Sequence, residues 1–254
     1  MKKIFTFILV LFTVVSFAHN GGISLEKSST LSTSQKSDGV ILPECWENLT
    51  QIAYYRWTDA DQNPLGWILG TNTYNDAAVA QVFVNNETLS IEGAYFWIAV
   101  VGPGTGDIVF SINEIAGGSI GDVIASVSMP LAEVTAYMEE GLTPADFTNS
   151  MYVEFENLVE VTSDFALVVD FSAVVYSVHG DGVAIVSNHL TQPCNAGQVF
   201  IQDSDGDWSV TTAVNAALTM VAGMFPVAVE PIPGDDFMVT FRVNMAPAVA
   251  DGFD

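Results

Sequence analysis

Short runs in which apolar and polar side chains alternate are the feature that most limits how this chain can fold. Side chains of a strand point to opposite faces in turn, so a period of two predicts one buried face and one face in water. In residues 106–115, Ile108, Phe110 and Ile112 share a face. The same alternation recurs in 122–129, 151–156 and 165–175. Such runs, separated by Gly, Asn, Asp and Pro, predict an antiparallel sandwich of two sheets.

Residues 91–101 depart from this pattern because they are apolar on both sides. A central strand that is covered on each face has this composition. Helical spacing is confined to Leu131, Val134 and Met138, which are followed by Gly141, and there is no strand-helix-strand rhythm to indicate a parallel sheet. The prediction is an all-β, jelly-roll-like antiparallel sandwich with one or two short helical turns.

The N-terminal residues predict export. Met1 is followed by two lysines, an apolar run from Ile4 to Phe17, and the small residue Ala18. This is the pattern of a cleavable signal peptide over residues 1–18. The apolar run is shorter than the roughly 20 residues of a membrane-spanning helix, so we expect no membrane insertion after cleavage.

Composition divides the rest of the chain into four segments. We predict a Ser/Thr-rich linker with little fixed structure in 19–44, the sandwich in 45–225, a Pro-rich linker in 226–236, and an alternating strand within 237–254. A lone amphipathic strand cannot bury its apolar face. The last segment therefore predicts either a further β module that this sequence only begins, or a strand that pairs back onto the sandwich.

The chain is strongly acidic, with thirty Asp and Glu against six Lys and Arg and a formal net charge of −24. A field of this sign repels phosphate backbones and anionic membranes, so nucleic acid is not expected as a partner. The acidity fits a heavily hydrated surface, and specific capture of a cation is the alternative.

The chain has two cysteines, Cys45 and Cys194. An even pair in an exported chain predicts a disulfide. A metal site needs more ligands than these two residues provide, and the sequence has no CxxC motif.

Three stretches stand out together: GWILGTN at 66–72 with AQVF at 80–83, IEGAYFW at 91–97, and VAIVS at 183–187. They resemble the N-terminal sandwich of large multidomain proteins that bacteria export by the type IX secretion route. Residues 239–245 and 252–254 are similar to the first strand of a starch- or glycogen-binding-like β module. The resemblance implies a protein secreted from, or held on the outer surface of, a Gram-negative bacterium, with downstream domains of the same protein as partners.

Residues 117–121 read Gly-Gly-Ser-Ile-Gly and match the nucleophile elbow of hydrolases, with His179 and His189 further along as candidate bases. An elbow requires a strand before Ser119 and a helix after it, whereas residues 120–129 alternate like a strand. We therefore interpret 117–121 as a glycine-rich hairpin turn. A secreted hydrolase that uses Ser119 with either histidine, assisted by calcium, is kept as the alternative function.

Asp203, Asp205 and Asp207 offer three carboxylates within five residues, a ligand set that suits a hard cation such as calcium. A hairpin between 199–201 and 208–210 also needs a polar, glycine-containing turn. The turn is the preferred interpretation and calcium binding is the alternative; we expect no other cofactor.

Aromatic and acidic residues suggest two further sites. Trp67 and Trp208 lie next to turns, where a flat ring could stack on a sugar, although most aromatic residues of a sandwich belong to its core. Glu154 and Glu156 share a strand face beside Tyr152, but glycosidase carboxylates approach a bond from opposite sides. We interpret this pair as a solvated face.

The sequence contains no complete set of catalytic residues. The predicted function is therefore a noncatalytic extracellular β-sandwich with an adhesive, spacer or glycan-contacting role.

Overall fold

A computed structural model describes residues 22–30, 39–43, 45–141, 150–176, 182–192, 194, 199–211 and 220–229. The predicted signal peptide and the predicted strand within 237–254 lie outside these residues. The described part of the chain is built from β-strands, with α1 as its single α-helix.

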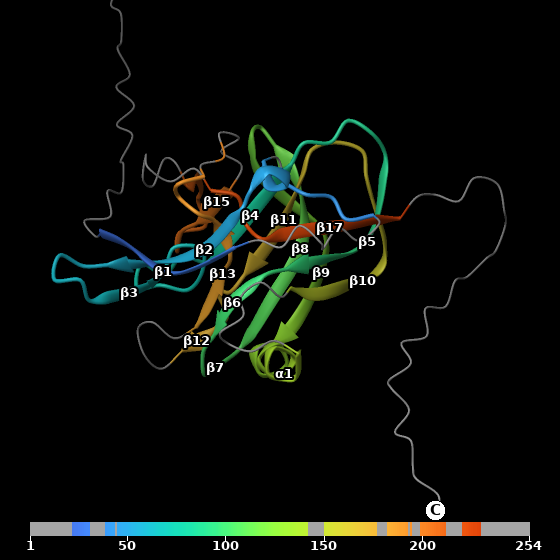
Figure 1. The fold of residues 1–254 in the computed structure, drawn as a ribbon. Helices are drawn as coiled ribbons and strands as arrows, with labels where there is room; N and C mark the ends of the chain where they lie inside the picture. Colours follow the sequence, from blue (N-terminus) through green and yellow to red (C-terminus); the bar gives the residue numbers. More distant parts are fainter. Residues whose placement is uncertain are drawn as a thin grey trace, which may run out of the picture.

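One layer of the molecule is a six-stranded sheet (Figure 1). Its order is β16 (Trp208–Val210), β15 (Val199–Gln202), β4 (Ala78–Phe83), β11 (Phe165–Asp170), β8 (Asp107–Ala116) and β9 (Ser119–Pro130). All neighbouring strands are antiparallel. Neighbours such as β4 and β11 are far apart in the sequence, so the chain leaves this sheet and returns to it, as in jelly-roll sandwiches.

The facing layer consists of three smaller sheets. The first has the order β1 (Gly22–Thr30), β2 (Gln51–Thr58) and β14 (Ser187–Asn188), with β3 (Pro64–Trp67) also paired to β2. The second has the order β10 (Met151–Val161), β5 (Leu89–Phe96) and β17 (Met224–Val229), and the third pairs β13 (Val183–Ile185) with β6 (Ile98–Val101). A short ladder of β12 (Val175–Tyr176) with β7 (Gly104–Thr105) completes the described strands.

The main core fills the space between the two layers. Ile108, Phe110 and Ile112 of β8 are completely buried in it, as their alternation predicted. Phe96 of β5 meets Phe110 with ring centroids 4.7 Å apart, so side chains of the two layers are in direct contact. The prediction of an all-β antiparallel sandwich is confirmed.

A second apolar cluster covers the outer face of the smaller sheets. Trp46 lies in the short 3-10 helix η1 (Trp46–Asn48), and its ring centroid is 5.6 Å from that of Trp97 and 4.9 Å from that of Phe225. Residues 91–101 therefore pack on the main core on one side and, around Trp97, on this cluster on the other. The prediction that this segment is covered on both faces is confirmed except at its partly exposed residues, among them Tyr95.

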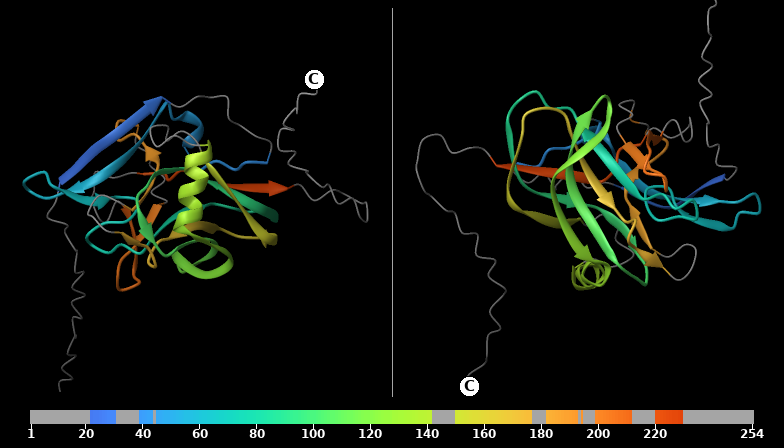
Figure 2. Two further views of the ribbon diagram at one scale, coloured as in Figure 1. Left: turned by 90° about the horizontal axis from the view of Figure 1, so that it is seen from below. Right: turned by 180° about the vertical axis from the view of Figure 1, so that it is seen from behind.

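The helix α1 (Leu131–Gly141) directly follows β9, an edge strand of the six-stranded sheet (Figure 2). It contacts β7. Leu131, Val134 and Met138 are buried in the main core, which confirms the helix expected from their spacing. The backbone N–H of Leu131 donates to the carbonyl of Gly106, 2.8 Å away, and so fixes the start of the helix.

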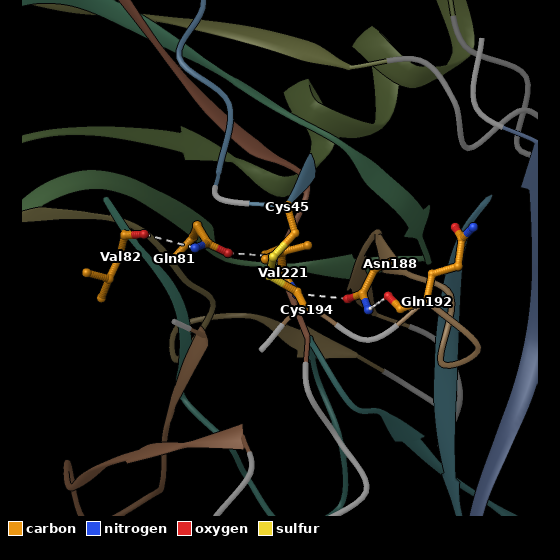
Figure 3. The surroundings of a disulfide bond; sticks show 8 residues. Cys45, Gln81, Val82, Asn188, Gln192, Cys194 and Val221 are labelled. Carbon is orange, nitrogen blue, oxygen red and sulfur yellow. Dashed lines mark hydrogen bonds between the residues drawn. A yellow bond between two sulfur atoms is a disulfide. The ribbon is translucent and has the colours of Figure 1, made fainter. Parts of the chain in front are cut away.

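A disulfide between Cys45 and Cys194 confirms the predicted bond and ties the start of η1 to the segment after β14 (Figure 3). Two completely buried amides support the chain nearby. The backbone N–H of Val221 donates to Asn188 Oδ1 at 2.8 Å, and that of Ala222 donates to Gln81 Oε1 at 2.9 Å. The bond and the two amides together hold the residues that lead into β17.

The prediction of little fixed structure in residues 19–44 is wrong for Gly22–Thr30, which form β1 along β2. Backbone hydrogen bonding to an otherwise open edge does not require apolar side chains, so a Ser-rich segment can form this strand. Residues 39–41 are also ordered, because Val40 bridges to Val227 and the N–H of Ile41 donates to the carbonyl of Pro226 at 2.9 Å.

The prediction that a linker begins at residue 226 is wrong, because Pro226 lies inside β17 opposite Ala94. Proline has no N–H to donate, and strands at a sheet edge are where it is tolerated. Residues 230–236 lie outside the described residues.

The first prediction concerns the disulfide. Changing both Cys45 and Cys194 to serine should lower the free energy of unfolding by about 2–5 kcal/mol, because a long loop in the unfolded chain is no longer closed. Urea denaturation followed by tryptophan fluorescence measures this loss. Reductant should destabilise the wild-type protein by a similar amount and leave the double variant unchanged. Equal stability of oxidised wild type and variant would show that the bond is not needed to hold η1.

Candidate functional site

Ser119 occupies a β-hairpin rather than a nucleophile elbow. Gly117 and Gly118 have φ angles of 62° and 84°, and they connect β8 to β9, where Ser119 pairs with Ala116. These left-handed conformations favour glycine and suit a tight two-residue hairpin turn. Because a strand and not a helix follows the serine, the prediction of a hairpin turn is confirmed.

His189, the histidine candidate that the structure describes, does not complete a catalytic site with Ser119. His179 lies outside the described residues. His189 Nδ1 is 2.7 Å from Thr191 Oγ1, and its backbone N–H donates to the carbonyl of Gln51. Among the described residues, Ser119 forms no hydrogen bond with a histidine, and no group of three or more His, Cys, Asp or Glu is placed to hold a metal ion.

Asp203 stabilises the turn between β15 and β16 through its own side chain. Its Oδ1 accepts hydrogen bonds from the backbone N–H groups of Asp205 and Asp207, both at 2.9 Å. Gly206 has a φ of 90°, which explains the glycine at this position. The prediction of a polar hairpin turn is confirmed, and the carboxylate of Asp203 serves the backbone within it.

The turn between β2 and β3 repeats this arrangement. Oδ1 of Asp59 accepts from the N–H groups of Asp61 at 2.9 Å and Asn63 at 2.8 Å, and Gln62 has a φ of 66°. Hydrogen bonds from the side chain and backbone of Asn63, and then from Asp61, hold the pKa of Asp59 below its usual range. The same five-residue turn in two hairpins points to a structural role for these aspartates.

Trp67 is not available for stacking on a sugar. Its side chain is 2% exposed, and the guanidinium carbon of Arg56 lies 4.5 Å from the centre of its ring. Tyr54 covers it further, with ring centroids 5.4 Å apart. The prediction that Trp67 presents a ring face to a ligand is wrong, because neighbouring side chains of β2 cover that face.

Trp208 is half-buried on the outer face of the six-stranded sheet. It packs on a small third cluster that includes Ala78, Ala80 and Ile120. Ile120 belongs to β9 and Trp208 to β16, the two edge strands of the sheet, and these strands are in contact with each other. The sheet therefore curls so that its edges approach, and Trp208 contributes to the packing there. It stays a candidate for ligand contact because part of its surface is open.

Two tyrosines form a more open aromatic surface on the outer face of the sheet β10-β5-β17. Tyr152 of β10 and Tyr95 of β5 are direct cross-strand partners, with ring centroids 4.9 Å apart and planes inclined by 49°. Both side chains are half-buried, in contrast to Trp67. We call Tyr95 and Tyr152 the tyrosine pair.

Gly93 determines how Tyr152 lies. A Cβ at position 93 would be 2.5 Å from the hydroxyl oxygen of Tyr152 and 2.6 Å from its Cζ atom. The outer end of the ring therefore rests directly on the backbone of Gly93, and the ring lies along the sheet instead of standing out from it. A ring in this position extends along the sheet surface, and part of it is exposed to solvent.

The tyrosine pair continues an aromatic row whose other end is covered. Phe225 of β17 is the cross-strand partner of Tyr95 on its other side, and it is buried under Trp46 and Trp97. The row is thus closed where η1 lies on it and open at Tyr95 and Tyr152. Sequence reasoning placed Tyr152 beside Glu154 and Glu156 but missed the pair, because the cross-strand register that joins Tyr152 to Tyr95 is set by residues far apart in the chain.

A separate polar cluster lies around Asn72, whose side chain is buried. Its Nδ2 donates to Asp76 Oδ2 at 2.7 Å, and the hydroxyl of Tyr176 donates to its backbone carbonyl at 2.8 Å. Burial, and then the negative charge of Asp76, raise the pKa of Tyr74 and of Tyr176. These contacts hold the loop between β3 and β4 in place, so we assign the cluster a structural role.

No family model and no curated protein matches the sequence. Among solved structures, the chain is similar to the cysteine protease and lectin-like domains of a surface layer associated protein of Clostridium difficile, with a TM-score of 0.45 and 9% identity. The match covers 77% of this chain and 37% of that one, so this chain spans well under half its length. A likeness this distant carries no argument about function.

The described helix is too short to cross a bilayer, and none of the described residues forms a helix that could.

The second prediction separates the structural and the cation-binding interpretations of the β15–β16 turn. Asp203→Ala should lower the free energy of unfolding by about 1 kcal/mol, because two backbone donors lose their acceptor. Asp203→Asn keeps an acceptor oxygen and should stay close to wild type. Thermal melting with and without calcium is the measurement. A calcium-dependent rise in melting temperature that Asp205→Asn or Asp207→Asn abolishes would instead establish a calcium site.

Proposed function

We propose that this chain is a noncatalytic extracellular β-sandwich module that contacts a glycan through the tyrosine pair. The single observation that carries the proposal is the position of Tyr152, which extends along the sheet over Gly93 beside Tyr95, with both side chains partly exposed. Aromatic rings with an exposed face and a polar edge suit the apolar faces of sugar rings and the hydroxyl groups around them.

Two further observations support a noncatalytic role outside the cell. The bond between Cys45 and Cys194 is of the kind that persists in oxidising compartments. Ser119, the nucleophile of the alternative hydrolase, lies within a hairpin and has no described base. Chemistry at that serine has no geometric support.

The remaining parts of the proposal rest on the sequence. Export through the type IX route, a place on the outer surface of a Gram-negative bacterium, and a downstream glycan-binding-like module beginning within 237–254 follow from the resemblance and the signal-peptide pattern. In such a protein this sandwich would act as one contact among several domains of the same chain. Weak binding by a single open surface is compatible with that arrangement, because linked modules reinforce one another.

The third prediction tests the tyrosine pair. On a glycan array, Tyr152→Ala and Tyr95→Ala should each weaken binding about tenfold, because stacking on an aromatic face contributes on the order of 1–2 kcal/mol. Tyr152→Phe keeps the ring and should keep most of the binding. Tyr137→Ala is the matched control, because Tyr137 is an exposed tyrosine on α1, 42% accessible to solvent.

Other results would change the assignment. Loss of binding in Trp208→Ala, with both tyrosine variants unaffected, would move the site to the six-stranded sheet. Absence of binding to every glycan on the array would overturn the glycan-contacting role and favour a spacer.

A further inference from the structure

The strand that carries Tyr152 is rich in carboxylates. Tyr152 is followed on β10 by Glu154, Glu156 and Glu160, all of which are exposed. Glu154 lies directly opposite Gly93, the residue on which the Tyr152 ring rests. Glu154 is thus a neighbour of the Tyr152 ring on the same side of β10, and its side chain has no hydrogen bond or ion pair with any other described residue.

No positive charge balances these carboxylates within the same sheet. The strands β10, β5 and β17 contain no Lys or Arg. The described residues include two basic side chains, Lys27 on β1 and Arg56 on β2, and both belong to a different sheet. Arg56 is already engaged, with Glu26 at 3.5 Å and with the ring of Trp67.

Charge therefore discriminates between sugars that fit the aromatic surface equally well. A sugar that stacks on Tyr152 brings its ring substituents close to Glu154, well within the roughly 8–10 Å over which charges interact at physiological salt. A protonated amino group there is attracted and a carboxylate or sulfate is repelled. A neutral hydroxyl or acetamido group experiences neither effect.

We propose that the tyrosine pair and Glu154 select glycans that carry free amino groups, with neutral glycans bound more weakly and acidic glycans rejected. This inference rests on the proposed function, because it assigns a ligand class to the same surface. The aromatic rings provide the contact, and the carboxylate decides which sugars use it.

Three hexasaccharides with the same β-1,4-linked glucose backbone isolate the effect of charge. Cellohexaose, chitohexaose and the hexamer of glucosamine carry hydroxyl, acetamido and amino groups at the same ring position. Calorimetric titration of the full chain at mildly acidic pH, where the amine is protonated, should give the glucosamine hexamer an affinity about two- to fivefold higher than the others, the range of an exposed ion pair. The preference should shrink as sodium chloride is raised.

Variants separate the carboxylate from the rings. Glu154→Gln should remove the preference for the glucosamine hexamer and leave cellohexaose binding unchanged. Glu133→Gln is the matched control, because it removes the same charge from an exposed position on α1. Tyr152→Ala should weaken binding of all three hexamers.

Each outcome has one reading. Equal binding of the three hexamers, with dependence on Tyr152, would overturn the amino-sugar inference and keep the proposed function. Binding of the glucosamine hexamer that survives Tyr152→Ala would overturn both, because attraction to the acidic surface would then be sufficient. No binding of any hexamer would overturn the amino-sugar inference, and the glycan array would then decide the proposed function.

Discussion

Burial of the segment 91–101 on both sides is the constraint on which the rest of the structure depends. Its inner side chains close the main core against the six-stranded sheet, where Phe96 meets Phe110. Its outer side chains, chiefly Trp97, need a second cover, and η1 provides it through Trp46. A helical segment of three residues has little stability of its own. The disulfide from Cys45 ties this cover to Cys194, which belongs to the same apolar cluster.

The candidate site is the part of this outer face that the cover leaves open. The aromatic row across β10, β5 and β17 runs from Tyr152 through Tyr95 to Phe225, and Trp46 lies on its far end. The same kind of side chain is therefore core at one end and accessible at the other. Gly93 allows the Tyr152 ring to extend along the sheet, because a side chain at that position would clash with its outer end.

Aspartate-led turns explain part of the acidic composition without a ligand. Asp59 and Asp203 each bind two backbone N–H groups of their own turn, and they do so in hairpins of opposite layers. The spacing of Asp203, Asp205 and Asp207 suggests a cation site in the sequence. In the folded chain, the Asp203 carboxylate instead accepts hydrogen bonds from the backbone of its own turn. Glu154, beside the tyrosine pair, differs from Asp59 and Asp203 because its carboxylate accepts no hydrogen bond from a described residue. Its charge acts in our proposal on the sugars that approach the surface.

The sequence by itself determined the strands, the antiparallel sandwich, the buried side of α1, the cysteine pair and the two glycine-containing hairpin turns. These follow from local periodicity and local backbone chemistry, which a chain carries wherever it folds. Tertiary structure alone decided that Ser-rich residues 22–30 form a strand, that Pro226 pairs within one, that Trp67 is covered and that Tyr152 is open. Burial of a given aromatic residue depends on side chains and backbone of other strands, such as Arg56 over Trp67 or Gly93 under Tyr152, and no local pattern records which of them will meet.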